Sequence, residues 1–134
     1  MEYLIGSVIA LSALGMAAIV GLSRDRAFFP TVLMVIATYY VLFGVLGDSS
    51  QALILECLVA AVFIAVAVVG FKSSLWWIAA ALAAHGLFDF THHLFIDNPG
   101  MPGWWPGFCG TFDVVAAGIV AAGLILHSKH PRPL

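Results

Sequence analysis

Four ionisable side chains lie close together in an otherwise apolar stretch of the chain: His85, Asp89, His92 and His93. In an α-helix, which turns about 100° per residue, Asp89 lies about 40° from His85, and His92 about 20° on the other side. His93 lies at the edge of the same stripe. Imidazole and carboxylate groups at this spacing can present ligand atoms to one metal ion or to a pair of ions. The stripe therefore predicts a metal site.

Two further carboxylates are expected at the depth of Asp89. In hydrophobic segments over residues 51–71 and 108–126, Glu56 and Asp113 lie roughly 8 Å inside the segment ends, and Asp89 lies roughly 10 Å inside its own. Like charges repel strongly in a medium of low dielectric constant. Because no lysine or arginine occurs at this depth, the carboxylates need a metal ion, a protonated histidine or protons.

The predicted ligands are imidazole and carboxylate groups, namely His85, Asp89, His92, His93 and Asp113, with Glu56 as an alternative to Asp113 for completing the shell. Zinc suits this set best, and iron or manganese would also fit. If the site is catalytic, the ion activates a bound water, and Glu56 or Asp113 acts as general base from outside the ligand shell.

Other interpretations of these residues stay open. The polar groups can form a proton-linked or purely hydrogen-bonded core, or His92 and His93 can lie at the membrane interface, apart from Asp89. Cys109 shares a helix face with Asp113 and is either a soft extra ligand or a packing residue. One of the two tyrosines at positions 39 and 40 can donate a hydrogen bond to the cluster.

The composition indicates the elements that position these side chains. The chain is 63% hydrophobic and 9% charged, with a mean hydropathy of +1.08, whereas a soluble domain is about half apolar and about a quarter charged. Lipid is the natural solvent for such a chain, and its 134 residues predict one domain over residues 1–134. The net charge of −2 gives no support for nucleic-acid binding, and two cysteines in apolar runs predict no disulfide framework.

A membrane-spanning helix needs about 20 mostly apolar residues. Five stretches meet this need or nearly do, over residues 3–22, 28–46, 51–71, 75–96 and 108–126. The breaks between them are short, which implies antiparallel neighbours, and the longest, over residues 97–107, is rich in proline and glycine and irregular. The sequence therefore predicts an all-α integral membrane protein, an antiparallel bundle of five transmembrane helices.

The basic residues indicate the orientation of this bundle. With five spans, all of them fall on one side, in the first and third loops and the C-terminal tail: Arg24, Arg26, Lys72, Lys129 and Arg132. Basic loops stay in the cytoplasm. We therefore expect the N-terminus outside and the C-terminus in the cytoplasm of a bacterial inner membrane.

The pattern His-x3-Asp-x2-His-His from His85, followed by Asn98-Pro99 and by Cys109-x3-Asp113, resembles a family of small bacterial membrane proteins of unknown function. The resemblance covers about the last 50 residues. It implies that these positions form one pattern, and it implies no activity.

The leading hypothesis is an intramembrane metalloprotein, with hydrolysis of a lipid-like substrate as its chemistry and the Pro/Gly/Trp loop as a lid. Membrane lipid and a second copy of the chain are the expected partners. One alternative is a proton- or metal-ion transporter, since intramembrane ionisable residues also mark ion pathways. The other is a structural accessory subunit of a membrane complex, because abundant small residues suit helix packing.

Overall fold

The computed structural model describes residues 1–129, which form helices and no strand. Five α-helices follow one another: α1 (Glu2–Ile19), α2 (Phe28–Leu46), α3 (Ser50–Lys72), α4 (Trp76–Thr91) and α5 (Trp105–Lys129). Two short 3₁₀ helices, η1 (Leu22–Arg24) and η2 (His92–Leu94), extend the connections after α1 and α4. The predicted all-α fold with five helices is confirmed.

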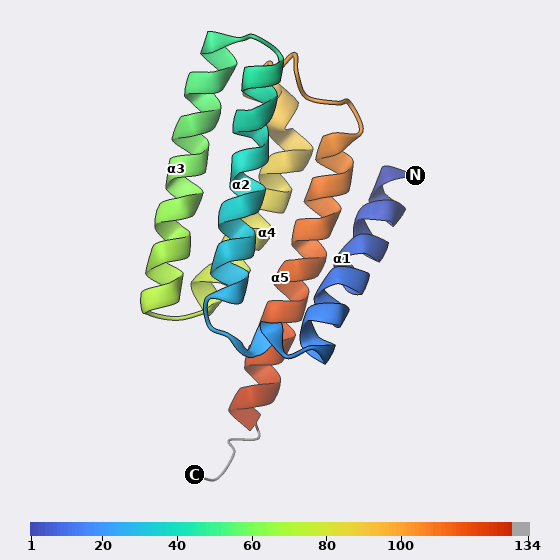
Figure 1. The fold of residues 1–134 in the computed structure, drawn as a ribbon, viewed down its shortest axis with the longest axis vertical. Coiled ribbons are helices and arrows are strands. Elements are labelled where there is room, and N and C mark those ends of the chain that lie inside the picture. Colours follow the sequence, from blue (N-terminus) through green and yellow to red (C-terminus); the bar gives the residue numbers. More distant parts are fainter. Residues whose placement is uncertain (130–134) are drawn as a thin grey trace.

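The helices run up and down the long axis of one bundle (Figure 1). The α2–α3 and α4–α5 connections lie at the upper end with the N-terminus, and the α1–α2 and α3–α4 connections lie at the lower end. The most extensive helix contacts join α4 to α5, α2 to α3, and α1 to α5. Helix α1 therefore lies at the edge of the bundle, held mainly by α5.

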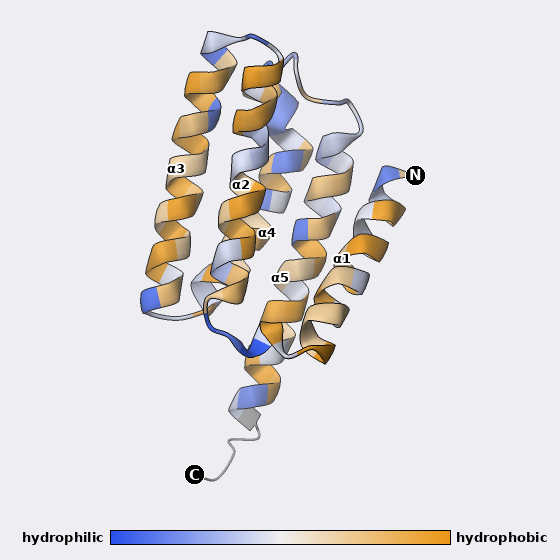
Figure 2. Ribbon diagram, in the orientation of Figure 1, coloured by the Kyte–Doolittle hydropathy of each residue, from blue (hydrophilic) through white to orange (hydrophobic). Residues whose placement is uncertain are grey.

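The outward faces of the helices are apolar, and several ionisable side chains are buried between the helices. Large hydrophobic side chains point outward along whole helix faces, such as Leu4, Val8 and Leu11 on α1 and Ile54, Leu58 and Val62 on α3. Figure 2 shows hydrophobic segments along all five helices and hydrophilic segments within the upper part of the bundle. Contiguous apolar surface of this extent is rare on soluble monomers and suits contact with lipid chains.

Four helices, α1, α2, α3 and α5, are long and apolar enough to cross a membrane. Helix α4 has only 16 residues, so the continuous helix predicted over residues 75–96 is wrong at its end. The 3₁₀ helix His92–Leu94 continues it. A 16-residue helix rises about 24 Å, and three residues of 3₁₀ helix add about 6 Å, which together reach the roughly 30 Å thickness of a hydrocarbon core.

The other predicted boundaries shift by a few residues. Helix α1 ends at Ile19 rather than at residue 22, because Gly21 takes a left-handed conformation with φ of 86° that a helix cannot contain. Helix α5 begins at Trp105 rather than at residue 108, since Pro106 is tolerated in the first turn of a helix.

Arg26 links the α1–α2 connection to the end of α3 by hydrogen bonds. Its Nε donates to the Phe71 carbonyl at 2.7 Å and its Nη2 donates to the Ser73 carbonyl at 2.8 Å. The α1–α2 connection, with Arg24 and Arg26, and the end of α3, with Lys72, therefore lie at the same end of the bundle. The predicted sidedness of the membrane stays a prediction, and Arg132 lies outside the described residues.

Helices α4 and α5 cross closely because each has a glycine at the crossing. A Cβ on Gly86 would lie 2.8 Å from the Gly110 carbonyl oxygen and 3.1 Å from Asp113 Cβ, and one on Gly110 would lie 3.0 Å from the Gly86 oxygen. Small residues at such a crossing allow two backbones to approach. This approach brings the polar residues of α4 against Asp113.

We predict that Gly86→Ala destabilises the bundle by about 1–3 kcal/mol, the usual cost of overpacking. Gly118→Ala on α5 is the matched control, because nothing lies within 4 Å of a Cβ there and a glycine-to-alanine change on an open helix face stabilises by about 0.4–1 kcal/mol. Thermal unfolding in detergent, followed by tryptophan fluorescence, measures both. Equal melting temperatures for the two variants would contradict the close crossing.

Candidate metal centre

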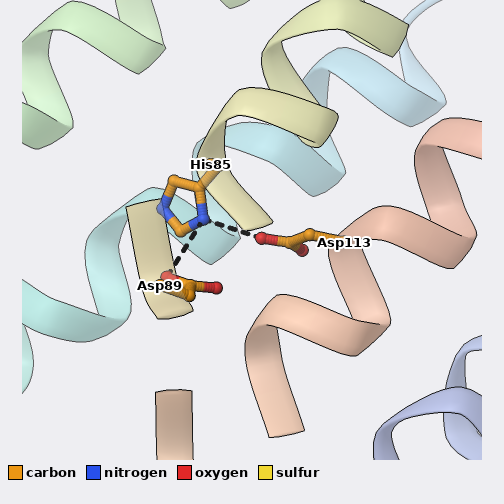
Figure 3. Close-up of side chains that lie close together, drawn as sticks. All are labelled: His85, Asp89 and Asp113. Carbon is orange, nitrogen blue, oxygen red and sulfur yellow. Dashed lines mark hydrogen bonds and ion pairs between the residues drawn. The ribbon is translucent and has the colours of Figure 1, made fainter. Parts of the chain in front are cut away.

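Three buried side chains meet between α4 and α5, and we call them the His85 cluster: His85, Asp89 and Asp113 (Figure 3). His85 Nδ1 lies 2.7 Å from Asp113 Oδ2 and 3.5 Å from Asp89 Oδ1. The exposed fraction of each side chain is 1% or less. One ring nitrogen therefore lies between two carboxylates that contact neither water nor lipid.

Local structure explains this arrangement. His85 and Asp89 are one helical turn apart, so they share a face of α4. Asp113 follows Gly110 by three residues on α5, so it lies on the face that crosses α4 at Gly86. The aromatic ring of Phe63 on α3 lies edge-on to the His85 ring, with centroids 4.6 Å apart, and closes the cluster from the third helix.

The three residues of the cluster lie close enough together to bind one shared metal ion. One ligand atom from each residue lies within 4.8 Å of the other two. Two ligand atoms that are each about 2 Å from one ion lie about 3 Å apart at tetrahedral or octahedral angles. The nitrogen–oxygen distances of 2.7 and 3.5 Å bracket that value, so a small shift would place all three around one ion.

Several oxygens of the cluster have no hydrogen-bond partner. Both carboxylate oxygens of Asp89 and Oδ1 of Asp113 are buried and make no hydrogen bond within the protein. Buried polar atoms are paired in the great majority of cases, and each exception needs a cause. Free carboxylate oxygens beside an imidazole are the atoms that a divalent cation binds.

No basic side chain balances these carboxylates. Among the side chains that the structure describes, the buried polar and charged ones are Glu56, His85, Asp89, His92, Asn98 and Asp113, with no lysine or arginine. Arg24, Arg26 and Lys72 are exposed and belong to the loops at the lower end of the bundle. The balancing positive charge must therefore come from the histidines or from a bound cation.

A second polar group, which we call the His92 cluster, lies against α3 and contains His92, Glu56 and Asn98. His92 Nε2 lies 2.7 Å from Glu56 Oε1. The Asn98 side-chain amide donates to the same oxygen at 2.9 Å and to the Tyr40 carbonyl at 3.1 Å. All three side chains are buried, so the loop after η2 is anchored to both α2 and α3.

Tyr40 lies between the two clusters. Its ring stacks on His92, with centroids 4.4 Å apart and an interplanar angle of 15°, and its centroid is 6.2 Å from that of His85. Its buried hydroxyl makes no hydrogen bond within the protein. Tyr39, the other candidate donor, contacts Trp105 instead.

The structure thus divides the predicted ligands. It brings His85, Asp89 and Asp113 together, whereas His92 contacts Glu56 and lies outside this group. His93 is exposed, because the backbone tightens into η2 after Thr91 and the side chain turns outward. The sequence pattern included Asn98 beside Pro99 but gave it no role, and the structure shows that its amide binds Glu56 and the Tyr40 carbonyl.

An apolar groove runs beside the His85 cluster between α1, α2 and α5, with a volume of about 540 Å³. It extends from Leu22 near the lower end to Trp105 at the start of α5. Cys109 is 3% exposed and lies on the groove wall one turn before Asp113. The groove therefore reaches the turn of α5 that precedes Asp113.

Comparisons with known proteins give no relative: no family model, no curated protein and no solved structure matches the chain.

We predict that Asn98→Ala lowers the free energy of unfolding by about 1–3 kcal/mol, because it leaves a buried carbonyl of Tyr40 and a carboxylate oxygen of Glu56 without this donor. The adjacent Asp97→Ala is the control, since Asp97 is exposed and such changes usually stay within about 0.5 kcal/mol. Unfolding by denaturing detergent measures both. A neutral Asn98→Ala would contradict the anchoring role of the amide.

Proposed function

We propose that this protein is an integral membrane metalloprotein that holds a divalent transition-metal ion in the His85 cluster. The observation that carries the proposal is the meeting of three fully buried ligand groups from two helices. Their carboxylates have unpartnered oxygens, and the buried side chains in the described part of the chain include no lysine or arginine. Zinc fits a set of one imidazole and two carboxylates, and iron or manganese also fit.

A proton on His85 Nδ1 is the competing explanation for the cluster. A proton and a metal ion cannot both occupy this nitrogen. An N–H at Nδ1 would donate to Asp113 across the 2.7 Å distance, whereas an ion bound to Nδ1 needs that nitrogen without its proton. A protonated His85 would form an ion pair with Asp89 Oδ1 across 3.5 Å, but it would leave Asp89 Oδ2 without a partner. A metal ion would engage the nitrogen and these oxygens together.

The location of the polar groups favours a site over a transport path. Glu56 lies about 9 Å below the start of α3 and Asp113 about 12 Å below the start of α5, and His85 and Asp89 are in the upper part of α4. Towards the lower end, the buried side chains are apolar, including Phe29, Leu33, Ile78, Leu82 and Val120. A path for ions would need polar groups there too.

The finer proposal is a metal-dependent hydrolase that acts on a lipid-like substrate. The apolar groove supports the substrate class, because its volume lies in the range of about 300–1,000 Å³ typical of ligand sites and its walls belong to membrane-spanning helices. A metal ion in the cluster would supply an activated water. Glu56, whose Oε2 is unpartnered, is the proposed general base.

We further propose that the lower end, with Arg24, Arg26 and Lys72, faces the cytoplasm of a bacterial inner membrane, in keeping with the preference of basic loops for that side. The His85 cluster would then lie in the outer half of the bilayer, and lipid would reach the groove from the side.

We predict that the purified protein, reconstituted with zinc, iron(II) or manganese, retains at least about one equivalent of a single metal per chain after dialysis. Asp89→Asn, which keeps the shape of the side chain and removes its charge, should reduce the bound metal to near zero. Elemental mass spectrometry measures the metal content. His93→Ala is the matched control, because His93 is exposed, and it should keep the wild-type content.

Wild-type protein without metal after all three reconstitutions would overturn the metalloprotein and favour a protonated His85 between the two aspartates. Equal metal content in the wild type and Asp89→Asn would place the ion elsewhere.

We predict that Val35→Trp, which fills the groove, weakens the binding of a lipid chain by about 1–3 kcal/mol, the cost of overpacking. Val35 is 48% exposed and lines the groove, and Leu42→Trp is the control, because Leu42 is 49% exposed on the same helix and lies outside the groove. Mass spectrometry of lipid retained through purification compares the variants. Equal retention would rule out the groove as the lipid site.

A further inference from the structure

The ring of His92 is held in one orientation and presents a free nitrogen. Glu56 lies at its Nε2 edge, 2.7 Å away, and Tyr40 covers its face at 4.4 Å. On the opposite edge, Nδ1 is buried and has no hydrogen-bond partner. The side chain itself is 0% exposed.

This is the arrangement that metal-binding histidines adopt. Such a histidine almost always donates its other ring N–H to a carboxylate or a carbonyl, which fixes the tautomer and strengthens the ligand nitrogen. Here Nε2 is placed to donate to Glu56, and Asn98 donates to the same carboxylate oxygen. The lone pair on Nδ1 is then available to an ion.

Asp89 precedes His92 by three residues in the chain. His92 itself has φ of −49° and ψ of −46°, whereas Thr91 before it has φ of −108° and ψ of −1°, so Asp89 and His92 lie about one turn apart at the junction of α4 and η2. A carboxylate and a histidine at this spacing supply the ligands of two-metal centres in helical bundles. Both Asp89 oxygens are unpartnered, so one can face the His85 side and the other the His92 side.

We propose that the centre binds two divalent transition-metal ions that share Asp89. The first ion lies among His85, Asp89 and Asp113, and the second between Asp89 and His92 Nδ1, with the unpartnered hydroxyl of Tyr40 beside it. The second position rests on the proposed function, because both ions need the Asp89 carboxylate.

The charges of the buried groups support two ions. With neutral histidines, the three carboxylates of Glu56, Asp89 and Asp113 exceed the charge of one divalent ion. Two ions with one hydroxide between them balance the carboxylates, and such a bridging ligand is a common feature of two-metal sites. The competing arrangement is one ion together with a protonated His92 paired with Glu56, and metal stoichiometry separates the two.

The test is equilibrium dialysis of the purified full chain against Zn²⁺ alone, with metal and protein both quantified. We expect about two ions per chain in the wild type and about one in His92→Ala, because the second position loses its nitrogen ligand. Asp113→Asn should also fall to about one. His93→Ala, the neighbouring histidine with an exposed side chain, should keep two.

One ion per chain in the wild type would overturn the second position and leave the proposed function intact, whereas no ion would overturn both. The spectrum of the wild-type protein loaded with Mn²⁺ tests the shared Asp89 ligand without any variant. Two Mn²⁺ ions that share a carboxylate show an exchange-coupled spectrum in electron paramagnetic resonance, whereas an isolated ion shows an uncoupled one. An uncoupled spectrum at saturating Mn²⁺ would overturn the shared-ligand arrangement even if His92→Ala failed to fold.

Discussion

The burial of three carboxylates without a lysine or arginine is the constraint on which the rest of the structure depends. Glu56, Asp89 and Asp113 are each at most 1% exposed, and charges of one sign in a low dielectric are costly unless they are paired. Among the buried side chains of the described residues, His85 and His92 are the potentially cationic ones. The fold must therefore place each imidazole against a carboxylate. The negative charge that the histidines do not balance can be balanced by a bound cation.

Close backbone contacts make this placement possible. Gly86 and Gly110 let α4 and α5 approach, which brings His85 within 2.7 Å of Asp113. At the upper end, Gly47 and Gly100 let the α4–α5 loop lie against the end of α2, which holds Asn98 between Tyr40 and Glu56. The same contacts that stabilise the bundle thus fix the orientation of both histidines.

The distribution of polarity also separates the centre from its surroundings. Apolar side chains cover the outer faces of the helices, and the buried ionisable side chains are enclosed between them. Figure 2 shows hydrophilic segments in the upper part of the bundle and also at its lower end, where the α1–α2 connection and the end of α3 lie. The groove between α1, α2 and α5 is lined by Cys109, one helical turn before Asp113. A hydrophobic molecule in the groove would therefore lie within about one turn of α5 from Asp113.

The sequence by itself determined the five helices, because hydrophobic runs separated by polar and Pro/Gly breaks depend on local composition. It also determined that His85 and Asp89 share a face, because helical spacing fixes this without any tertiary contact. Only the tertiary structure decided how the helices are rotated about their axes. That rotation set Asp113 beside His85 and Glu56 beside His92. The tertiary structure also decided that the chain changes from α-helix to 3₁₀ helix at His92, with His92 buried and His93 exposed, because the following loop is tied to α2 and α3 through Asn98 by contacts distant in sequence.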